Sequence, residues 1–193
     1  MSYSNSDFYT GKGVKISKDD DQYSTDFGKC MKIITNGYPP DSPYETPNHL
    51  LKSSTSSDVE HHDIIILSTL AGRVDQGLGL LHELLRESRR NSQPPVRLWL
   101  LSEQSLTFLL PPGKSNIKSL SSSAGIFTKN IGIVPIYGAA VISTKGLEWD
   151  VQDWETEMGG MVSTSNHVLG DEVVVVTDRV VLFTVERVRR DGA

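Results

Sequence analysis

Apolar residues recur at helical spacing after a polar stretch near the beginning of the chain. Four of them fall at i, i+3, i+4 and i+7 and therefore share one face of a helix: Phe27, Cys30, Met31 and Ile34. Ser24 and Thr25 can each cap the beginning of this helix, and Gly37 with the two prolines that follow it shortly afterwards ends it. The pattern predicts a helix over roughly residues 26–36.

A second helix is predicted between two short apolar runs. It extends from about Asp75 to Arg90 and places four leucines on one face: Leu78, Leu81, Leu84 and Leu85. The runs at 63–68 (DIIILS) and 97–102 (RLWLLS) are typical of strands covered on both faces. Such a series indicates an α/β layer with a mostly parallel sheet. Two weaker predictions are a short strand at 12–17 and a long surface insertion at 38–61.

After about residue 104 the pattern changes to strands without a convincing helix. The predicted strands are 105–110, 132–137, 139–144, 160–163, 173–177 and 180–188. The last two are expected to form a hairpin around Asp178-Arg179, and the Ser- and Gly-rich stretch 113–129 is expected to be a loop. We therefore predict a partial α/β domain over 1–105, followed by an all-β sandwich over 106–193.

Composition narrows the class of protein. Of 193 residues, 37% are apolar and 22% are charged, which is typical of a globular protein. The net charge of −5 gives no reason to expect a nucleic-acid partner. The single cysteine, Cys30, fits a reducing compartment, and the sequence contains neither a signal peptide nor an apolar run of membrane-spanning length. We expect a cytoplasmic protein without membrane partners.

The segment LAGRVDQ (residues 70–76) joins the first apolar run to the leucine helix, where open α/β sheets bind ligands. Gly72 permits a tight backbone, and Arg73 offers a bidentate fork for phosphate. A lone Asp75 would be an ordinary first-turn acid, favoured by the helix dipole. However, Gly77 and Gly79 weaken the helix, which indicates that something approaches its backbone closely. The combination predicts an active-site turn that handles phosphate.

A second candidate lies in the β half. Trp149 and Trp154 flank acidic residues in LEWDVQDWETE (147–157), and a hydroxyl- and amide-rich cluster follows at 163–166 (STSN). One interpretation is a pair of core tryptophans and a polar turn. The other is an aromatic face beside hydrogen-bond donors, which suits a flat, cationic heterocycle.

Five motifs together resemble the thiamine pyrophosphokinase family, its fungal branch in particular. They are DQYSTDFGKC (21–30), LAGRVDQ (70–76), LLSEQSLTFLL (100–110), KGLEWD (145–150) and GGMVSTSN (159–166), in the family's order and at compatible spacing. The resemblance implies a catalytic α/β domain and a C-terminal β-sandwich. It also implies transfer of pyrophosphate from ATP to thiamine with Mg²⁺, by a homodimer that binds thiamine between the α/β domain of one subunit and the sandwich of the other.

Matching positions carry the family's site residues over to this chain. Those on the nucleotide and metal side are Gln22, Thr25, Asp26, Arg73, Asp75 and Gln76. Those that would contact thiamine are Gln22, Trp149, Ser163 and Asn166. The resemblance implies that Asp26 and Asp75 bind the metal and that, with Arg73, they are catalytic. Either carboxylate could accept the proton of the thiamine hydroxyl, and the sequence does not choose between them.

One departure from the family concerns its main metal site, an Asp-x-Asp within a G-D-x-D-S motif upstream of the first matching segment. This chain has no such motif. Because Mg²⁺ prefers carboxylate and phosphate oxygens, we expect weak Mg²⁺ binding and no thiamine-dependent AMP formation by the chain as it stands. Missing central strands would also expose the apolar faces of 63–68 and 97–102. The alternatives are a truncated, non-catalytic paralogue or fragment that binds only thiamine or a partner subunit, and an unrelated small-molecule binding module.

Overall fold

The computed structural model describes residues 5–37, 62–67, 70, 72–90, 95–120 and 125–189. The chain divides into two compact units, one formed by residues 1–62 and 89–96, the other by residues 63–88 and 97–193. The insertion expected at 38–61 lies outside the described residues.

The described part of the first unit contains two helices, α1 (Asn5–Gly11) and α2 (Asp26–Asn36). The prediction of a strand at 12–17 is wrong, because the backbone there is irregular and Val14 is 48% exposed. A short alternating segment is not stable as a strand without partners in a sheet. Helix α1 was missed because its seven residues, NSDFYTG, are too few to show helical periodicity.

Helix α2 begins and ends as its sequence predicts. The Thr25 hydroxyl accepts a hydrogen bond from the Gly28 backbone N–H at 3.1 Å, so Thr25 rather than Ser24 is the N-cap. Gly37 follows the last turn with φ of 80°, and its N–H donates to the Ile33 carbonyl. A positive φ of this kind favours glycine and satisfies a carbonyl at the helix end.

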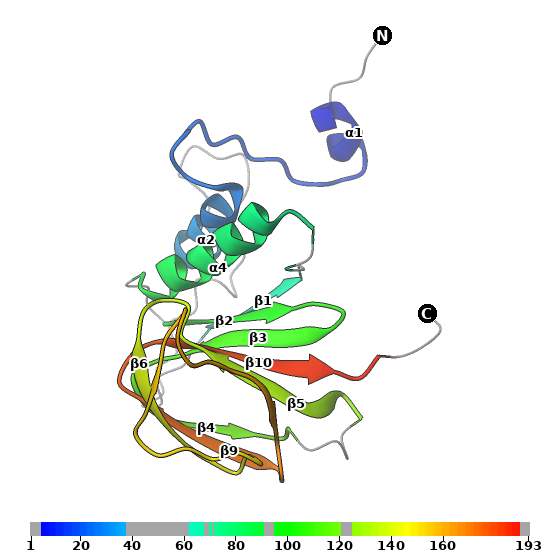
Figure 1. Cartoon of the computed structure of the whole chain (residues 1–193). Coiled ribbons are helices and arrows are strands. Elements are labelled where there is room, and N and C mark those ends of the chain that lie inside the picture. Colours follow the sequence, from blue (N-terminus) through cyan, green and yellow to red (C-terminus); the bar gives the residue numbers. More distant parts are fainter. Residues whose placement is uncertain are drawn as a thin grey trace, which may run out of the picture. The chain divides into compact units, whose positions relative to one another are not determined.

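The second unit contains helix α4 (Val74–Ser88) and two β-sheets. The six-stranded sheet has the order β1 (His62–Leu67), β2 (Val96–Leu101), β3 (Ser105–Leu110), β10 (Val181–Arg187), β5 (Phe127–Val134) and β8 (Ser163–His167). The four-stranded sheet has the order β4 (Gly113–Lys118), β9 (Glu172–Thr177), β6 (Ala140–Lys145) and β7 (Trp154–Thr156). Figure 1 shows β4, β9 and β6 in a layer facing β3, β10 and β5. The predicted fold class, an α/β segment followed by a β-sandwich, is confirmed.

The α/β strands continue into one layer of the sandwich. Strand β2 pairs antiparallel with β3, with Leu100 opposite Thr107 and Leu101 opposite Leu106. The turn between them is closed by Ser102, whose N–H donates to the Ser105 carbonyl at 2.9 Å. The expected domain boundary near residue 105 therefore lies in a β-hairpin.

The hairpin predicted around Asp178-Arg179 is wrong. Strand β9 pairs with β4 and β6, whereas β10 pairs with β3 and β5, so the short turn passes from one sheet to the other. The turn is attached to β6, since the Val141 N–H donates to the Asp178 carboxylate at 2.7 Å. Strand β9 alternates buried with more exposed positions, whereas β10 is buried at four of its first five positions, and facing layers bury these side chains against one another better than an edge-to-edge pair would.

Three boundaries in the β half also differ from the predictions. The stretch 113–129 is not one loop, because it contains strand β4 and the beginning of β5. Strand β4 is an edge strand with Ile117 as its only large apolar residue, so its sequence lacks a strong strand pattern. The strand expected at 160–163 is instead β8 at Ser163–His167, and the three-residue β7 was missed.

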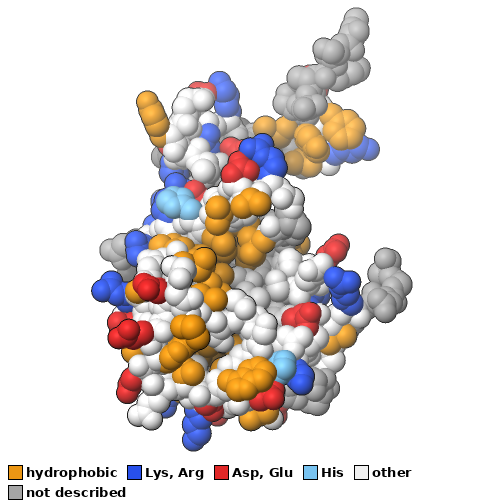
Figure 2. Space-filling view, in the orientation of Figure 1, with side chains coloured by type: hydrophobic (Ala, Val, Ile, Leu, Met, Phe, Trp, Pro, Cys, Tyr) orange, Lys and Arg blue, Asp and Glu red, His pale blue; other side chains and the backbone are white. Residues whose placement is uncertain are grey.

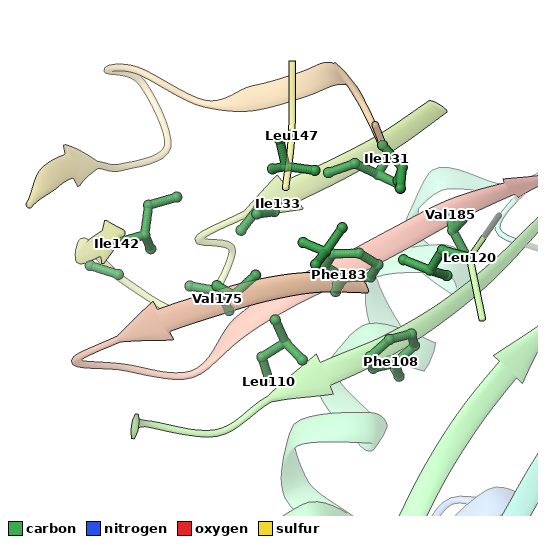
Figure 3. Close-up of a cluster of buried hydrophobic side chains, with 14 residues drawn as sticks. Phe108, Leu110, Leu120, Ile131, Ile133, Ile142, Leu147, Val175, Phe183 and Val185 are labelled. Carbon is green, nitrogen blue, oxygen red and sulfur yellow. The ribbon is translucent and has the colours of Figure 1, made fainter. Parts of the chain in front are cut away.

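The core of the second unit lies between its two sheets. Figure 3 shows side chains from both layers pointing into one shared space, with Phe183 among them. Phe183, Val173, Val175 and Val185 are completely buried. On the six-stranded sheet, the hydroxyls of Thr107 and Thr184 bond across β3 and β10 at 2.6 Å, which satisfies two polar groups within the sheet.

Strand β1 is the edge of the six-stranded sheet and is not covered on both faces as its apolar run predicts. Ile65 is 60% exposed and Leu67 79% exposed, which confirms the expected exposure of this run. The exposure expected for the second run is wrong, since Leu98 and Leu100 on β2 are buried. Figure 2 shows further hydrophobic side chains gathered in patches on the visible face of the molecule.

Candidate functional site

The turn before helix α4 brings Arg73 and Asp75 together. Gly72 has φ of 94°, which confirms the need for glycine in this turn. The Arg73 guanidinium donates from Nε to Asp75 Oδ1 at 3.1 Å and from Nη2 to Oδ2 at 2.6 Å. The Arg73 bond lowers the pKa of the Asp75 carboxyl below its ordinary value. Both side chains are largely exposed, so this turn presents a cation and an ionised carboxylate to solvent at a helix N-terminus.

The two helix glycines have different explanations. A Cβ on Gly77 would lie 3.2 Å from the Leu70 carbonyl oxygen, so glycine there lets the helix pack against the preceding turn. Gly79 has no described atom within 4 Å of a Cβ position. The group that approaches the helix backbone closely at Gly77 is therefore part of the chain itself. Gln76 is exposed in the first turn, and its N–H donates to the Arg73 carbonyl at 3.1 Å.

The first unit carries the other candidates of the nucleotide side, at the beginning of α2. Gln22 and Asp26 are exposed, and the Thr25 hydroxyl is engaged as the helix cap. Asp21, which sequence reasoning missed, accepts bonds from the Ser24 hydroxyl and the Tyr23 N–H. The Ser24 bond is the larger cause that lowers the pKa of Asp21 to about 2. These residues belong to the first unit, whereas Arg73 and Asp75 belong to the second.

The motif KGLEWD forms a structured loop in the second unit. Gly146 has φ of 100°, and a Cβ there would lie 2.4 Å from the Glu172 carbonyl oxygen. Leu147 is 2% exposed and anchors the loop in the core. The Asp150 carboxylate accepts bonds from the Gly146 N–H, the Leu147 N–H and the Thr144 hydroxyl at 2.9–3.1 Å. These contacts hold Trp149 out toward solvent, where its side chain is 55% exposed.

The Asn166 side chain holds the main chain of Trp149 from both sides. Its Oδ1 accepts from the Trp149 N–H at 3.2 Å, and its Nδ2 donates to the Trp149 carbonyl at 2.8 Å. The same Oδ1 accepts from the His167 N–H at 2.8 Å. Asn166 is 6% exposed, so this amide is a buried connection between β8 and the Trp149 loop.

A pocket of about 300 Å³ lies beside this loop. Its walls combine aromatic and aliphatic side chains with hydroxyls and an amide: Ile133, Ile142, Thr144, Trp149, Val151, Trp154, Val162, Ser163, Thr164, Ser165 and Asn166. The structure thus brings the predicted Trp149, Ser163 and Asn166 together at one cavity. The Ser163 hydroxyl makes no hydrogen bond to another described residue, so it is available to a ligand.

Three residues near this pocket were not singled out as site residues. Trp154 was noted only as a flanking tryptophan, yet it lines the cavity. Glu148 and His167 pair with one another beside Trp149, and the only signal in the sequence is that each adjoins a predicted residue. The core-tryptophan interpretation is wrong for Trp149, because most of this loop residue remains exposed.

Within the described ranges, no group of three or more His, Cys, Asp or Glu side chains could hold a metal ion. None of the helices that the structure describes has both the length and the apolar character needed to cross a membrane.

Two family models match the chain. One, described as the catalytic domain of thiamin pyrophosphokinase, matches residues 1–96, and the other, described as its vitamin B1 binding domain, matches residues 115–182. The Arg73–Asp75 turn lies within the first matched region. The pocket, including Trp149 and Asn166, lies within the second.

Curated relatives and solved structures agree with these matches. A thiamine pyrophosphokinase of Arabidopsis thaliana is 30% identical over 181 residues, covering 93% of this chain and 59% of the relative. Thiamin pyrophosphokinase from Candida albicans aligns with a TM-score of 0.76 at 25% identity, covering 95% of this chain and 68% of that chain. The yeast enzyme aligns with a TM-score of 0.75 at 26% identity, covering 96% and 67%. This chain spans 54–60% of the length of the curated relatives that it matches.

Proposed function

The chain belongs to the thiamine pyrophosphokinase family, and from that premise we propose that it serves the transfer of a pyrophosphoryl group from ATP to thiamine. The products are thiamine diphosphate and AMP. The pocket beside Trp149 carries this proposal, because it lies in the region that matches a vitamin B1 binding domain and has the chemistry of a thiamine site.

Thiamine combines a flat pyrimidine with a cationic thiazolium. The exposed indole of Trp149 offers a π-face to such a cation, and Trp154 adds a second aromatic wall. The free hydroxyl of Ser163 supplies a hydrogen bond to a polar edge of the ligand. Asn166 supports the site by fixing the main chain of Trp149, and its second Nδ2 hydrogen remains for the ligand. The family resemblance also assigns Gln22 to thiamine binding.

On the nucleotide side, we propose that Arg73, Asp75 and Gln76 meet the polyphosphate of ATP. The Arg73 guanidinium donates two hydrogen bonds to the Asp75 carboxylate, and phosphate oxygens present the same acceptor geometry. A bound polyphosphate can therefore replace Asp75 as the partner of Arg73, or share Arg73 with it. Thr25 and Asp26 stand at another helix N-terminus, where N–H groups attract anions. Phosphoryl transfer depends mainly on this positioning and charge.

The donor set fits a Mg²⁺ ion that arrives with ATP, since Mg²⁺ is usually held by one or two carboxylates plus phosphates and water. Asp26 and Asp75 would be those carboxylates, and both are exposed. The ion would offset negative charge on the transferring group. Either Asp26 or Asp75 would accept the proton from the thiamine hydroxyl.

The organisation of the protein forms part of the same proposal. We place the catalytic part within residues 1–105 and the thiamine-binding sandwich within 106–193, supported by model matches at 1–96 and 115–182. A homodimer would place thiamine between the catalytic part of one subunit and the sandwich of the other. We propose a cytoplasmic location, which the single cysteine favours.

An alternative is a protein that binds thiamine or a partner subunit without catalysis. It is favoured by the position of the pocket, because all the residues that line it belong to the second unit and none of them is a proposed nucleotide-side residue. Calorimetry with thiamine and a coupled assay for AMP separate the two functions. Thiamine binding with AMP formation supports the enzyme, whereas thiamine binding without AMP formation supports the alternative. No thiamine binding would refute the enzyme and the thiamine-binding form of the alternative, and would leave only binding to a partner subunit.

The variant Asp75→Asn tests the nucleotide side. Where the coupled assay shows AMP formation, loss of a group that positions polyphosphate should lower this turnover by about 10²–10³-fold while thiamine affinity stays the same. Glu103→Gln, in the exposed β2–β3 turn, is the matched control and should retain full turnover. Unchanged turnover in Asp75→Asn would remove Asp75 from the site.

A further inference from the structure

The Trp149 indole is supported by a residue outside the pocket. Its ring centroid lies 5.2 Å from that of His167, with the two planes inclined at 41°. His167 is not among the residues that line the pocket. We propose that His167, held by Glu148, is a positioning residue that orients Trp149 as a wall of the ligand pocket. This inference rests on the proposed thiamine site.

Glu148 and His167 are joined twice. His167 Nδ1 donates a hydrogen bond to Glu148 Oε2, and the Glu148 N–H donates to the His167 carbonyl at 2.8 Å. The His167 side chain is 24% exposed and that of Glu148 42% exposed, so water screens the pair only in part. The backbone bond fixes the distance between the loop and β8, and the side-chain bond then fixes the plane of the imidazole.

Trp149 needs such support because its hydrogen bonds to described residues act only on its main chain. Asn166 fixes the N–H and the carbonyl of Trp149, which leaves the two side-chain torsions to be set elsewhere. The indole is 55% exposed and makes no hydrogen bond to another described residue. The imidazole of His167 therefore restricts those torsions, and a ligand would meet a ring that is already oriented.

The structure predicts how binding changes when this support is removed. In His167→Ala and in Glu148→Ala the Trp149 side chain would become ordered only when thiamine binds. The free-energy cost of ordering this side chain should weaken thiamine affinity roughly two- to tenfold. Glu148→Gln keeps an acceptor for Nδ1 and should recover most of the affinity. In a Trp149→Ala background, His167→Ala should cause no further loss, because its effect passes through Trp149. Glu103→Gln serves as the surface-carboxylate control.

A second measurement needs no ligand. Subtracting the fluorescence of Trp149→Phe from that of the wild type isolates the Trp149 signal, and acrylamide quenching of this signal reports how mobile and accessible the ring is. His167→Ala and Glu148→Ala should increase the quenching, whereas Glu103→Gln should not.

The outcomes distinguish this inference from the proposed function. If the wild type does not bind thiamine but quenching rises in both variants, the thiamine site is refuted and the orienting role of His167 stands. If thiamine binds and neither affinity nor quenching changes, the inference is overturned. The inference would also be overturned if His167→Ala lowered thiamine affinity by the same factor in the wild-type and Trp149→Ala backgrounds. The same holds if the thiamine affinity of Glu148→Gln were as low as that of Glu148→Ala.

Discussion

The Trp149 loop depends on a glycine that no other residue can replace without strain. We consider Gly146→Ala, which adds one methyl group at a position with φ of 100°. The new Cβ would lie 2.4 Å from the Glu172 carbonyl oxygen and 3.5 Å from the Val173 Cα. Both neighbours are backbone atoms at the beginning of β9, so no flexible side chain can move aside.

Two costs add in this variant. A positive φ costs a non-glycine residue about 1–2 kcal/mol. Relieving the contact shifts the backbone beside Val173, which is completely buried, and overpacking of this kind costs about 1–3 kcal/mol. The free energy of unfolding should therefore fall by about 2–5 kcal/mol, which lowers the Tm by roughly 5–15 °C.

Urea denaturation followed by circular dichroism measures this change, and two other glycines separate its causes. Gly138 has φ of 128° and no described atom within 4 Å of its Cβ position, so Gly138→Ala should show only the conformational cost. Gly170→Ala, which has open space and no positive φ, should change stability by less than about 1 kcal/mol. If Gly146→Ala is no less stable than Gly138→Ala, the contact with Glu172 does not constrain the loop and our reasoning is refuted.

Three further predictions concern the second unit. Tyr137 donates to the Leu81 carbonyl at 2.7 Å, so Tyr137→Phe should lower the free energy of unfolding by about 0.5–1.5 kcal/mol in urea titrations; an unchanged midpoint would contradict this. Burial raises the pKa of Tyr137 from 10.0 to about 12, so the folded state holds this proton more tightly than the unfolded state does. The free energy of unfolding of the wild type should therefore decline between those two pH values, and Tyr137→Phe should lack this part of the decline. Phe183→Ala should cost about 3–5 kcal/mol because the side chain is fully buried, and a loss below 1 kcal/mol in the same assay would show that the core collapses around the cavity. Leu67→Lys on the exposed edge strand should leave unfolding unchanged and reduce self-association in light scattering, whereas equal scattering would show that this edge does not associate.

Local sequence determined the elements whose signals lie within a few residues. Thr25 and Gly37 set the limits of α2 because a cap bonds to backbone only three or four positions away. The apolar runs of β9 and β10 indicated strands for the same reason. The motifs around Arg73, Asp75 and Trp149 are also enough, as sequence, to indicate the family.

Tertiary structure alone decided which of these elements meet. Strand β4 forms because β9 supplies its partner, although its own sequence is polar. The strands β9 and β10 lie in different sheets, since pairing depends on residues far away in the chain. The Asn166 amide holds the main chain of Trp149, seventeen positions earlier, and the His167 ring lies beside the Trp149 indole. Sequence periodicity reports the face that a residue turns toward the core, but the partner of a polar side chain is fixed only when distant segments pack together.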